Sequence, residues 1–442
     1  MKRLSVILML FGLWGPSAAW AQSAPAAPAQ PLTLRAAVTF ALAHNQAYRA
    51  AFSDVSAACE KVNQARAGFL PKVDGSYRFM RWQNQPYAAI PGIFPPEPFA
   101  VQTDNRWEVD IVQPLFTGFQ LISNYKASKA GLRISKYSLE KARLDLTRDV
   151  KVAYLQTLLG EKLVQVARQN VSSLEVQKNN AEVSFKQGVA ARNDVLKADV
   201  ALAEAVQRER QTVKQLIVLR SALNQYMGIG LEERIQLAGI AKSTSPVPGL
   251  DQLYEIAQQR RPEYLSLKES IRQAEDYKTV AEGEFYPHVS AFAQYYQEGE
   301  DFPGTNNPYT NSHNAALGVK VDWNLFNGGK SRASVLEWDY RLTGLEQRRT
   351  DLLQKIDLQV KDALKQLQVA RANIGTSRTA LRQAKENERI TTLQYKEQVA
   401  IFLDVLNSEV FLAQTRADFY QAVYGYEIAR AELERAIAAP LN

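Results

Sequence analysis

The residue types that carry most enzyme chemistry are rare in this sequence of 442 residues, and their spacing forms no site. Its three histidines, His44, His288 and His313, are scattered along the chain without metal-ligand spacing. The single cysteine, Cys59, cannot form an internal disulfide, and we interpret it as a small buried apolar residue. No glycine-rich phosphate-binding motif occurs. The sequence therefore predicts neither an enzyme nor a metal or cofactor site.

Two aspartates occupy equivalent positions in the two halves of the sequence. Asp194 and Asp404 both begin the tripeptide Asp-Val-Leu, 210 residues apart, and each follows a predicted turn between helices. The helix dipole favours an acidic residue in the first turn of a helix, which is a sufficient structural explanation for both. The elements that carry the aspartates therefore decide what these side chains can do.

The first residues indicate export from the cytoplasm. Lys2 and Arg3 precede the apolar run Leu4–Trp14, and small residues up to Ala21 complete a secretory signal peptide of residues 1–21. The next residue is Gln22 rather than the cysteine of a lipoprotein, and no later run of about 18 apolar residues could form a transmembrane helix. The net charge of +7 mixes both signs along the chain, which indicates a solvated surface and no nucleic-acid partner.

The remaining chain contains one unit twice. Phe69–Val73 recurs as Phe285–Val289, 216 residues later, and Leu115–Gly118 recurs as Leu325–Gly328, 210 residues later. The change of offset places a length difference of six residues in the proline-rich segment 84–104, which we expect to be an exposed loop. The predicted organisation after the signal peptide is an N-terminal linker (22–31), a first structural repeat (32–227), an equatorial linker (228–249), a second structural repeat (250–438) and a C-terminal tail (439–442).

Each repeat is predicted to hold a helix, two strands and a long helical hairpin. In the first repeat we expect an unbroken helix over 32–68, strands over 72–82 and 106–113, and a helix of about 100 Å from 119 to 185 that returns from 193. Counting in sevens from Tyr125 gives only apolar or small residues, namely Leu132, Leu139, Leu146, Ala153, Gly160, Ala167, Leu174 and Ala181. A seven-residue stripe of this kind predicts coiled-coil packing with close helix approach.

The four predicted strands per chain require more than one copy of the chain if they face lipid. Val109 and Ile111 alternate with Glu108 and Asp110, which is typical of a strand with one apolar face. An open sheet in lipid would leave unpaired edge groups. Two copies give a barrel of eight strands whose interior side chains nearly fill it, whereas three give twelve strands and a lumen. A pore therefore favours a trimer.

The order and spacing of several short motifs resemble those of TolC-like outer-membrane efflux proteins, the outer membrane factor family. These motifs are Phe69-Leu70-Pro71, Leu115-Phe116-Thr117-Gly118 and Phe185-Lys186-Gln187-Gly188, with their counterparts in the second half. The resemblance covers essentially the whole chain after the signal peptide. It implies a homotrimer with a twelve-stranded β-barrel in outer-membrane lipid and a long α-helical tunnel in the periplasm. It also implies docking to a periplasmic adaptor (membrane fusion) protein and an inner-membrane pump of RND or ABC type, for efflux or type I secretion.

The resemblance assigns functional positions to the helix tips and the barrel. Adaptor docking is implied at Phe185, Gly188, Val189 and Ala190, and at Tyr395, Gln398 and Val399 in the second copy, where Gln398 replaces the glycine. A periplasmic aperture is implied at Asp404, with Asn407 one turn later in place of a second carboxylate and Asp194 in the first copy. Aromatic residues beside the strands, Trp82, Trp107, Tyr295, Tyr296 and Trp323, are expected at the membrane interfaces. A glycine at a helix end also has a purely conformational explanation, and so do first-turn aspartates.

Two other classes of function remain open at this point. A periplasmic coiled-coil adaptor or scaffold without a pore would share the long helices but would have no need of four membrane-compatible strands. A hydrolase or binding protein would need a convergent polar site, and the sequence has none. The cargo, whether drugs, metal ions, siderophores or proteins, leaves no mark in this sequence.

Overall fold

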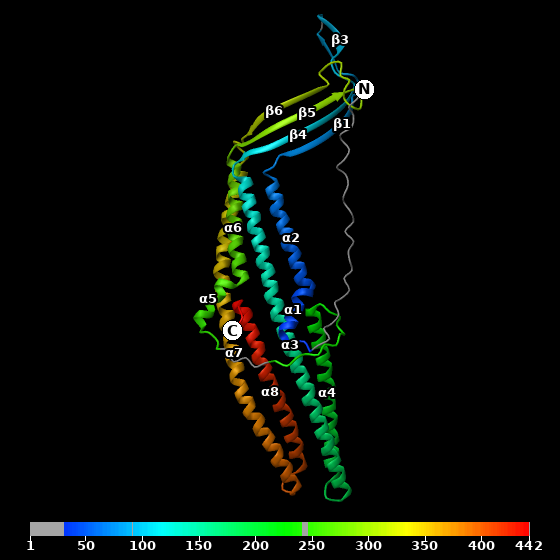
Figure 1. Ribbon diagram of the computed structural model, residues 1–442, viewed down its shortest axis with the longest axis vertical. Coiled ribbons are helices and arrows are strands. Elements are labelled where there is room, and N and C mark those ends of the chain that lie inside the picture. The colour runs from blue at the N-terminus through cyan, green and yellow to red at the C-terminus, as the bar shows by residue number, and fades with distance from the viewer. Residues whose placement is uncertain (1–30, 91, 241–245, 442) are drawn as a thin grey trace.

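The computed structural model describes residues 31–90, 92–240 and 246–441. The expected signal peptide and nearly all of the expected N-terminal linker lie outside these residues. The described chain is strongly elongated, with a small sheet at one end and helical hairpin tips at the other (Figure 1). Within the described ranges, no helix is both long and apolar enough to cross a membrane.

The first helical segment is two helices, not the single helix expected over 32–68. Helix α1 covers Leu34–His44 and α2 covers Gln46–Ala67. Asn45 between them has extended backbone, caps α2 by accepting a hydrogen bond from the Tyr48 amide at 3.0 Å, and donates its side-chain amide to the Tyr226 carbonyl at 2.9 Å. The second half breaks at the corresponding place, because α5 (Leu250–Arg260) ends before Pro262 and α6 covers Pro262–Glu282. Cys59 is exposed on α2, so its expected burial is wrong for the single chain.

The main sheet has four antiparallel strands in the order β1-β4-β5-β6. These strands are β1 (Lys72–Arg81), β4 (Thr103–Thr117), β5 (His288–Gly299) and β6 (His313–Asp322). Strands β4 and β5 come from different halves of the sequence and pair in the centre of the sheet, with an irregularity between Pro114 and Phe116. Strands β1 and β6 are the two edges.

The segment 84–104 is more ordered than the expected loop. It contains a second, two-stranded sheet of β2 (Tyr87–Ile90) and β3 (Phe94–Pro98), which projects beyond the main sheet at the end farthest from the helices (Figure 1). Its counterpart between β5 and β6 contains no strand among its described residues. The length difference between the halves therefore corresponds to a protruding hairpin.

Two helical hairpins of matching size extend from the sheet. The first is α3 (Gln120–Lys186) with α4 (Arg192–Met227), and the second is α7 (Lys330–Lys396) with α8 (Phe402–Ile437). In both hairpins the outgoing helix has 67 residues and the returning helix has 36. The returning helix thus spans only the distal half, and α2 or α6 covers the proximal half of the long helix (Figure 1).

Close helix approach explains the small residues of the seven-residue stripe. A Cβ atom added to Gly160 of α3 would lie 3.2 Å from the side chains of Leu216 and Leu219 of α4, tighter than ordinary van der Waals contact. Leu146, Ala153, Leu174 and Ala181 of the same stripe are buried. The predicted coiled-coil seam therefore runs through the first hairpin.

The middle of the molecule is held by a buried tyrosine and a charged cluster. The Tyr154 hydroxyl of α3 lies 2.7 Å from the carbonyl oxygen of Leu32, just before α1, and 2.6 Å from that of Ala238, in the segment after α4. It therefore connects α3 to both of these segments. Burial raises the pKa of Tyr154 to about 12. Nearby, Arg435 of α8 binds Asp145 of α3 at 2.5 Å and Glu263 of α6 at 2.6 Å. The two halves are therefore joined at mid-height by both apolar and ionic contacts.

The junction between sheet and helices depends on two glycines in close contact. Gly118 has a left-handed backbone with φ of 57°, and an added Cβ atom would lie 2.5 Å from the carbonyl oxygen of Gly283. Gly283 opens the single-turn 3-10 helix η1 (Gly283–Phe285) after α6, and its own added Cβ would lie 2.3 Å from Gln120. The glycine of the Leu-Phe-Thr-Gly motif thus has a packing role as well as a conformational one.

Candidate functional site

The sheet has one apolar and one polar face, and the strand register assigns every residue to one of them. Val109 of β4 lies between Gly75 of β1 and Tyr295 of β5, and Val319 of β6 pairs with Ala291. The large side chains of this face are solvent-exposed in the single chain, with Val73 and Val319 both 63% exposed. Among the residues that the structure describes, nothing covers this apolar face.

The opposite face carries a connected set of charges. Arg106 of β4 binds Glu108 at 3.2 Å and Glu298 of β5 at 3.3 Å, and the Gln294 side chain donates a hydrogen bond to Glu108. The Arg106 guanidinium also lies 4.3 Å from the centre of the Tyr296 ring. The register thus places Tyr296 on the polar face beside Arg106, opposite the face that carries Tyr295.

The other expected interface aromatics lie on or next to the apolar face at two heights. Near the protruding hairpin, Trp82 follows β1, and the Trp107 indole donates to the Phe302 carbonyl at 3.0 Å. At the helix end, the Trp323 indole donates to the Phe285 carbonyl at 3.1 Å. Tyr295 lies between these two levels, directly beside Val109.

The two hairpin tips share one backbone geometry although their sequences differ. In the first tip, Gly188 has φ of 78°, and the amides of Val189 and Ala190 both donate to the carbonyl of Ser184. In the second, Gln398 takes the same left-handed conformation with φ of 62°. The amides of Val399 and Ala400 likewise donate to one carbonyl, that of Gln394. The missing glycine therefore leaves the turn unchanged and is expected to add conformational strain.

The side chains of the two tips differ more than their backbones. Phe185 is 44% exposed in the first tip, whereas Tyr395 is half-buried and packs on Phe402 with ring centres 5.5 Å apart. The residue that corresponds to Phe402 in the first hairpin is Arg192. Val189 and Val399 are both strongly exposed. Each tip thus presents an apolar residue to solvent, but only the first presents an aromatic ring freely.

Two of the three expected aperture residues, Asp194 and Asp404, lie on the first turns of the returning helices, and Asn407 lies one turn later on α8. Asp404 and Asn407 are exposed side chains of α8, and Asp404 takes part in none of the ion pairs between described residues. They line a groove with Asn387, Thr391 and Gln394 of α7. Asp194 of α4 instead lies 3.6 Å from Lys197, which partly neutralises it. The structure therefore leaves Asp404 as the carboxylate that is free to act on ions.

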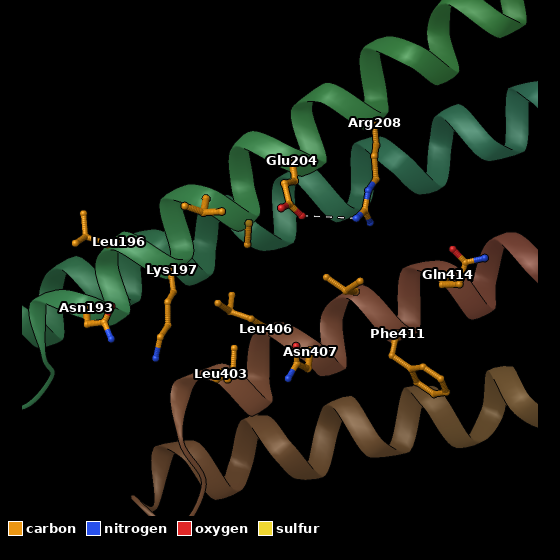
Figure 2. A pocket seen from close by; sticks show the side chains of 13 residues that line it. Asn193, Leu196, Lys197, Glu204, Arg208, Leu403, Leu406, Asn407, Phe411 and Gln414 are labelled. Carbon is orange, nitrogen blue, oxygen red and sulfur yellow. Dashed lines mark ion pairs between the residues drawn. The ribbon is translucent and has the colours of Figure 1, made fainter.

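A larger groove separates the two hairpins, and sequence patterns gave no sign of it. It has a volume of about 940 Å³, lies between α4 and α8, and is lined by both apolar and polar side chains (Figure 2). Leu196 and Val200 of α4 and Leu406 and Phe411 of α8 are among its lining residues, and Glu204 and Arg208 form an ion pair on its α4 wall (Figure 2). Asn407 belongs to both this groove and the smaller one on α7.

The second hairpin also contains a carboxylate pair where the first has a salt bridge. Lys178 of α3 binds Asp199 of α4 at 2.7 Å, and the corresponding residues are Glu388 and Glu409. Glu409 is buried, and its pKa is raised first by burial and then by the charge of Glu388. Aligning the two halves of the sequence residue by residue was the signal that could have revealed this pair.

Comparisons with known proteins agree with this geometry. The family model described as outer membrane efflux protein matches residues 38–229 and 253–439. The outer membrane efflux protein BepC of Brucella suis is 22% identical over 398 residues, which are 90% of this chain and 83% of that protein. The alkaline protease secretion protein AprF of Pseudomonas aeruginosa is 23% identical over 410 residues, which are 89% of this chain and 82% of that protein.

Solved structures show the same fold at lower identity. The outer membrane protein VceC of Vibrio cholerae superimposes with a TM-score of 0.79 at 15% identity, covering 92% of this chain and 97% of that one. Identity at this level supports the fold alone. The family model, by contrast, matches most of the sequence in both halves. This chain belongs to the outer membrane efflux protein family.

Proposed function

We propose that three copies of this chain form a passive channel across the outer membrane, continued by a helical tunnel through the periplasm. The observation that carries the proposal is the two-faced sheet with both edges open. Its neighbouring strands are all antiparallel, so β1 and β6 run in opposite directions. The β6 edge of one copy can therefore pair antiparallel with the β1 edge of the next. Three copies close a barrel of twelve strands, an even number that keeps the alternation of direction.

In this barrel the apolar face meets lipid and the charged face lines the lumen. Trp107 pairs with Gln297 of β5. Trp323 directly follows Asp322, which pairs with His288 of β5. Gln297 and His288 are nine positions apart on β5. Nine residues span about 30 Å along a strand, which a tilt near 40° reduces to about 24 Å of height. This height matches the apolar band of about 25 Å in outer-membrane barrels. The two tryptophan levels are thus the proposed membrane interfaces.

The long helices supply the periplasmic part of the duct. Helices of 67 residues are about 100 Å long. The equal element lengths of the two halves, and the match of the family model to both, support an internal twofold repeat in each protomer. Three protomers would then form a wall with six similar hairpins. The proposed organisation keeps the repeat boundaries at 32–227 and 250–438, with the linker 228–249 outside the wall.

The hairpin tips are the proposed contact with the rest of an export machine. We place adaptor docking at Phe185, Gly188, Val189 and Ala190 in the first tip and at Tyr395, Gln398 and Val399 in the second. Asp404 is the proposed aperture carboxylate, repeated three times around the axis. Like charges brought together in this way attract cations into the opening.

The names of the relatives indicate two kinds of export system that use such a channel, efflux and protein secretion. BepC is named as an efflux protein and AprF as an alkaline protease secretion protein. We infer that this channel serves an adaptor with an inner-membrane pump of RND or ABC type. Export of the chain itself by a signal peptide of residues 1–21, without lipid attachment at Gln22, fits this location.

The direct test is reconstitution of the purified full-length protein into planar lipid bilayers. The channel hypothesis predicts a trimer by light scattering in detergent, a stepwise ion conductance, and a weaker preference for cations in Asp404→Asn. The competing hypothesis of a pore-free periplasmic scaffold predicts a protein that stays in the aqueous fraction and gives no conductance. Trimers that insert but conduct equally well with and without Asp404 would keep the channel and remove the aperture role.

A further inference from the structure

A continuous row of basic side chains runs along the distal half of α7. It consists of Arg371, Arg378, Arg382, Lys385, Arg389 and Lys396, which we call the α7 basic stripe. The spacings of seven, four and three residues place all six on one side of the helix. The stripe extends for about 38 Å at 1.5 Å per residue. All six side chains are exposed, and among the ion pairs of the described residues only Arg389 takes part, with Glu386 at 2.8 Å.

The first hairpin has no equivalent of this stripe. The corresponding positions of α3 are Glu161, Arg168, Ser172, Glu175, Asn179 and Lys186, which carry as many acidic as basic residues. Two of them form ion pairs with α4 of the same hairpin: Glu161 binds Arg220 at 2.9 Å, and Arg168 binds Glu209 at 3.3 Å. In the second hairpin the counterpart of Glu209 is Phe419. Arg378 therefore has no carboxylate opposite it on α8.

In the proposed wall of six hairpins, the stripe lies away from the contacts between neighbouring copies. Within one chain, α3 presents Gln177 and Ser173 towards Glu409 of α8. Their counterparts on α7 are Asn387 and Gln383, which mark the side of α7 that meets the next copy in the proposed sixfold wall. At 100° per residue the stripe is centred about 150° around the helix from these two residues. Asn387 also lines the groove of Asp404, so the stripe lies on the opposite side of the wall from the aperture carboxylate.

We propose that the α7 basic stripe is a docking surface for an acidic α-helix of the periplasmic adaptor, which lies along the outside of α7 instead of touching the tip turns alone. This proposal rests on the proposed function and names the chemistry of its partner. A partner helix with glutamate or aspartate at spacings of three and four residues would match the row of cations. The first hairpin lacks the stripe, so this mode of docking is specific to the second hairpin.

The test compares two charge-reversal variants of the same helix. The stripe variant is Arg378→Glu, Arg382→Glu and Lys385→Glu, and the control is Lys355→Glu, Lys361→Glu and Lys365→Glu, three exposed lysines of α7 outside the stripe. The probe is a synthetic antiparallel helical hairpin with glutamates at heptad spacing on one face, together with a version carrying lysines instead. Binding to the purified full-length trimer is measured by fluorescence anisotropy at several salt concentrations.

The proposal predicts that the unmodified channel binds the glutamate hairpin, with affinity falling as salt rises, and does not bind the lysine hairpin. The stripe variant should bind the glutamate hairpin about 30-fold more weakly, since three attractions become three repulsions. The control should bind it within about twofold of the unmodified channel. Equal binding by the stripe variant and the control would overturn the proposal.

Two further measurements separate the alternative roles of the stripe. Loss of the trimer in the stripe variant alone would make the stripe an interface between copies, and a large change of ion selectivity in bilayers would place it in the lumen. Either result overturns docking on the outer surface. If the unmodified protein forms no conducting trimer, the proposed function fails, whereas a conducting trimer that ignores the glutamate hairpin refutes only this inference.

Discussion

Replacing Val109 by arginine places a charge on the apolar face of the central strand β4. Val109 lies one residue from Asp110, the middle residue of β4 (Thr103–Thr117). Its partner Tyr295 lies two positions along β5 from Gln297, the Trp107 level, so Val109 lies about 7 Å along the strand inside that edge of the proposed membrane band. Its neighbours on that face, Gly75 and Tyr295, offer no carboxylate to pair with the new charge.

The expected cost follows from the depth of the residue and the number of copies. Arginine on the lipid face of a transmembrane barrel costs about 2–4 kcal/mol at the bilayer midplane and about 0–1 kcal/mol near the interfaces, so about 1–2 kcal/mol is expected at the depth of Val109. Three copies per trimer therefore give about 3–6 kcal/mol, which is a large fraction of the stability of a typical protein. We expect Val109→Arg to accumulate outside the membrane or to be degraded, and not merely to assemble more slowly.

The assay measures the fraction of trimer in outer-membrane preparations and its refolding into lipid vesicles. The matched control is Asp110→Arg, the same substitution one residue away on the lumen face, beside Asp74 and Gln294. That arginine gains a carboxylate neighbour and meets water, so insertion should stay within about twofold of the unmodified protein. Normal insertion of Val109→Arg, or equal failure of both variants, would refute the assignment of the two faces.

Three other substitutions test local features of the structure. Gln398→Gly removes a left-handed non-glycine residue and should stabilise the second tip by up to about 1 kcal/mol, measured as local hydrogen-exchange protection, whereas Gln398→Ala should not. Glu409→Gln replaces a carboxyl whose pKa is raised in the folded protein. The stability contributed by the protonated carboxyl is fully present below its ordinary pKa and is lost as pH rises through the raised value. In denaturant unfolding at several pH values, the free energy of unfolding of the variant should not show this decrease. Tyr154→Phe removes the hydroxyl beside the carbonyls of Leu32 and Ala238 and should cost about 1–1.5 kcal/mol in the same assay, a loss of less than about 0.3 kcal/mol being incompatible with a buried hydrogen bond.

Periodic features of this fold were predictable because one physical cause repeats along the chain. Strand alternation identified β4 from Val109 and Ile111, and the seven-residue stripe identified the seam that passes Gly160. Features fixed by a single tertiary contact were not predictable. The break at Asn45 depends on a hydrogen bond to the distant Tyr226 carbonyl, so the alanine-rich sequence around it indicated one helix.

Differences from expectation at the candidate site have similar causes. Tyr296 was grouped with Tyr295 because adjacent aromatics look alike in a sequence, but a shift of one residue reverses the face. The hairpin β2 with β3 was hidden by prolines, which ordinarily argue against strands. The groove between α4 and α8 is formed by two helices that are far apart in sequence, and no local pattern encodes it.

The proposed internal repeat accounts for the shared backbone of the two hairpins, whose side chains differ. In the first hairpin, charges are satisfied internally, as Lys178 with Asp199 and Arg168 with Glu209 demonstrate. The second hairpin keeps the turn geometry and helix lengths but replaces these partners, which leaves Arg378 without a carboxylate on α8 and buries Glu409. Internal pairs contribute little net stability at an exposed surface, so their loss costs the fold little. The freed cations can instead select a partner, because charge complementarity contributes more to specificity than to affinity.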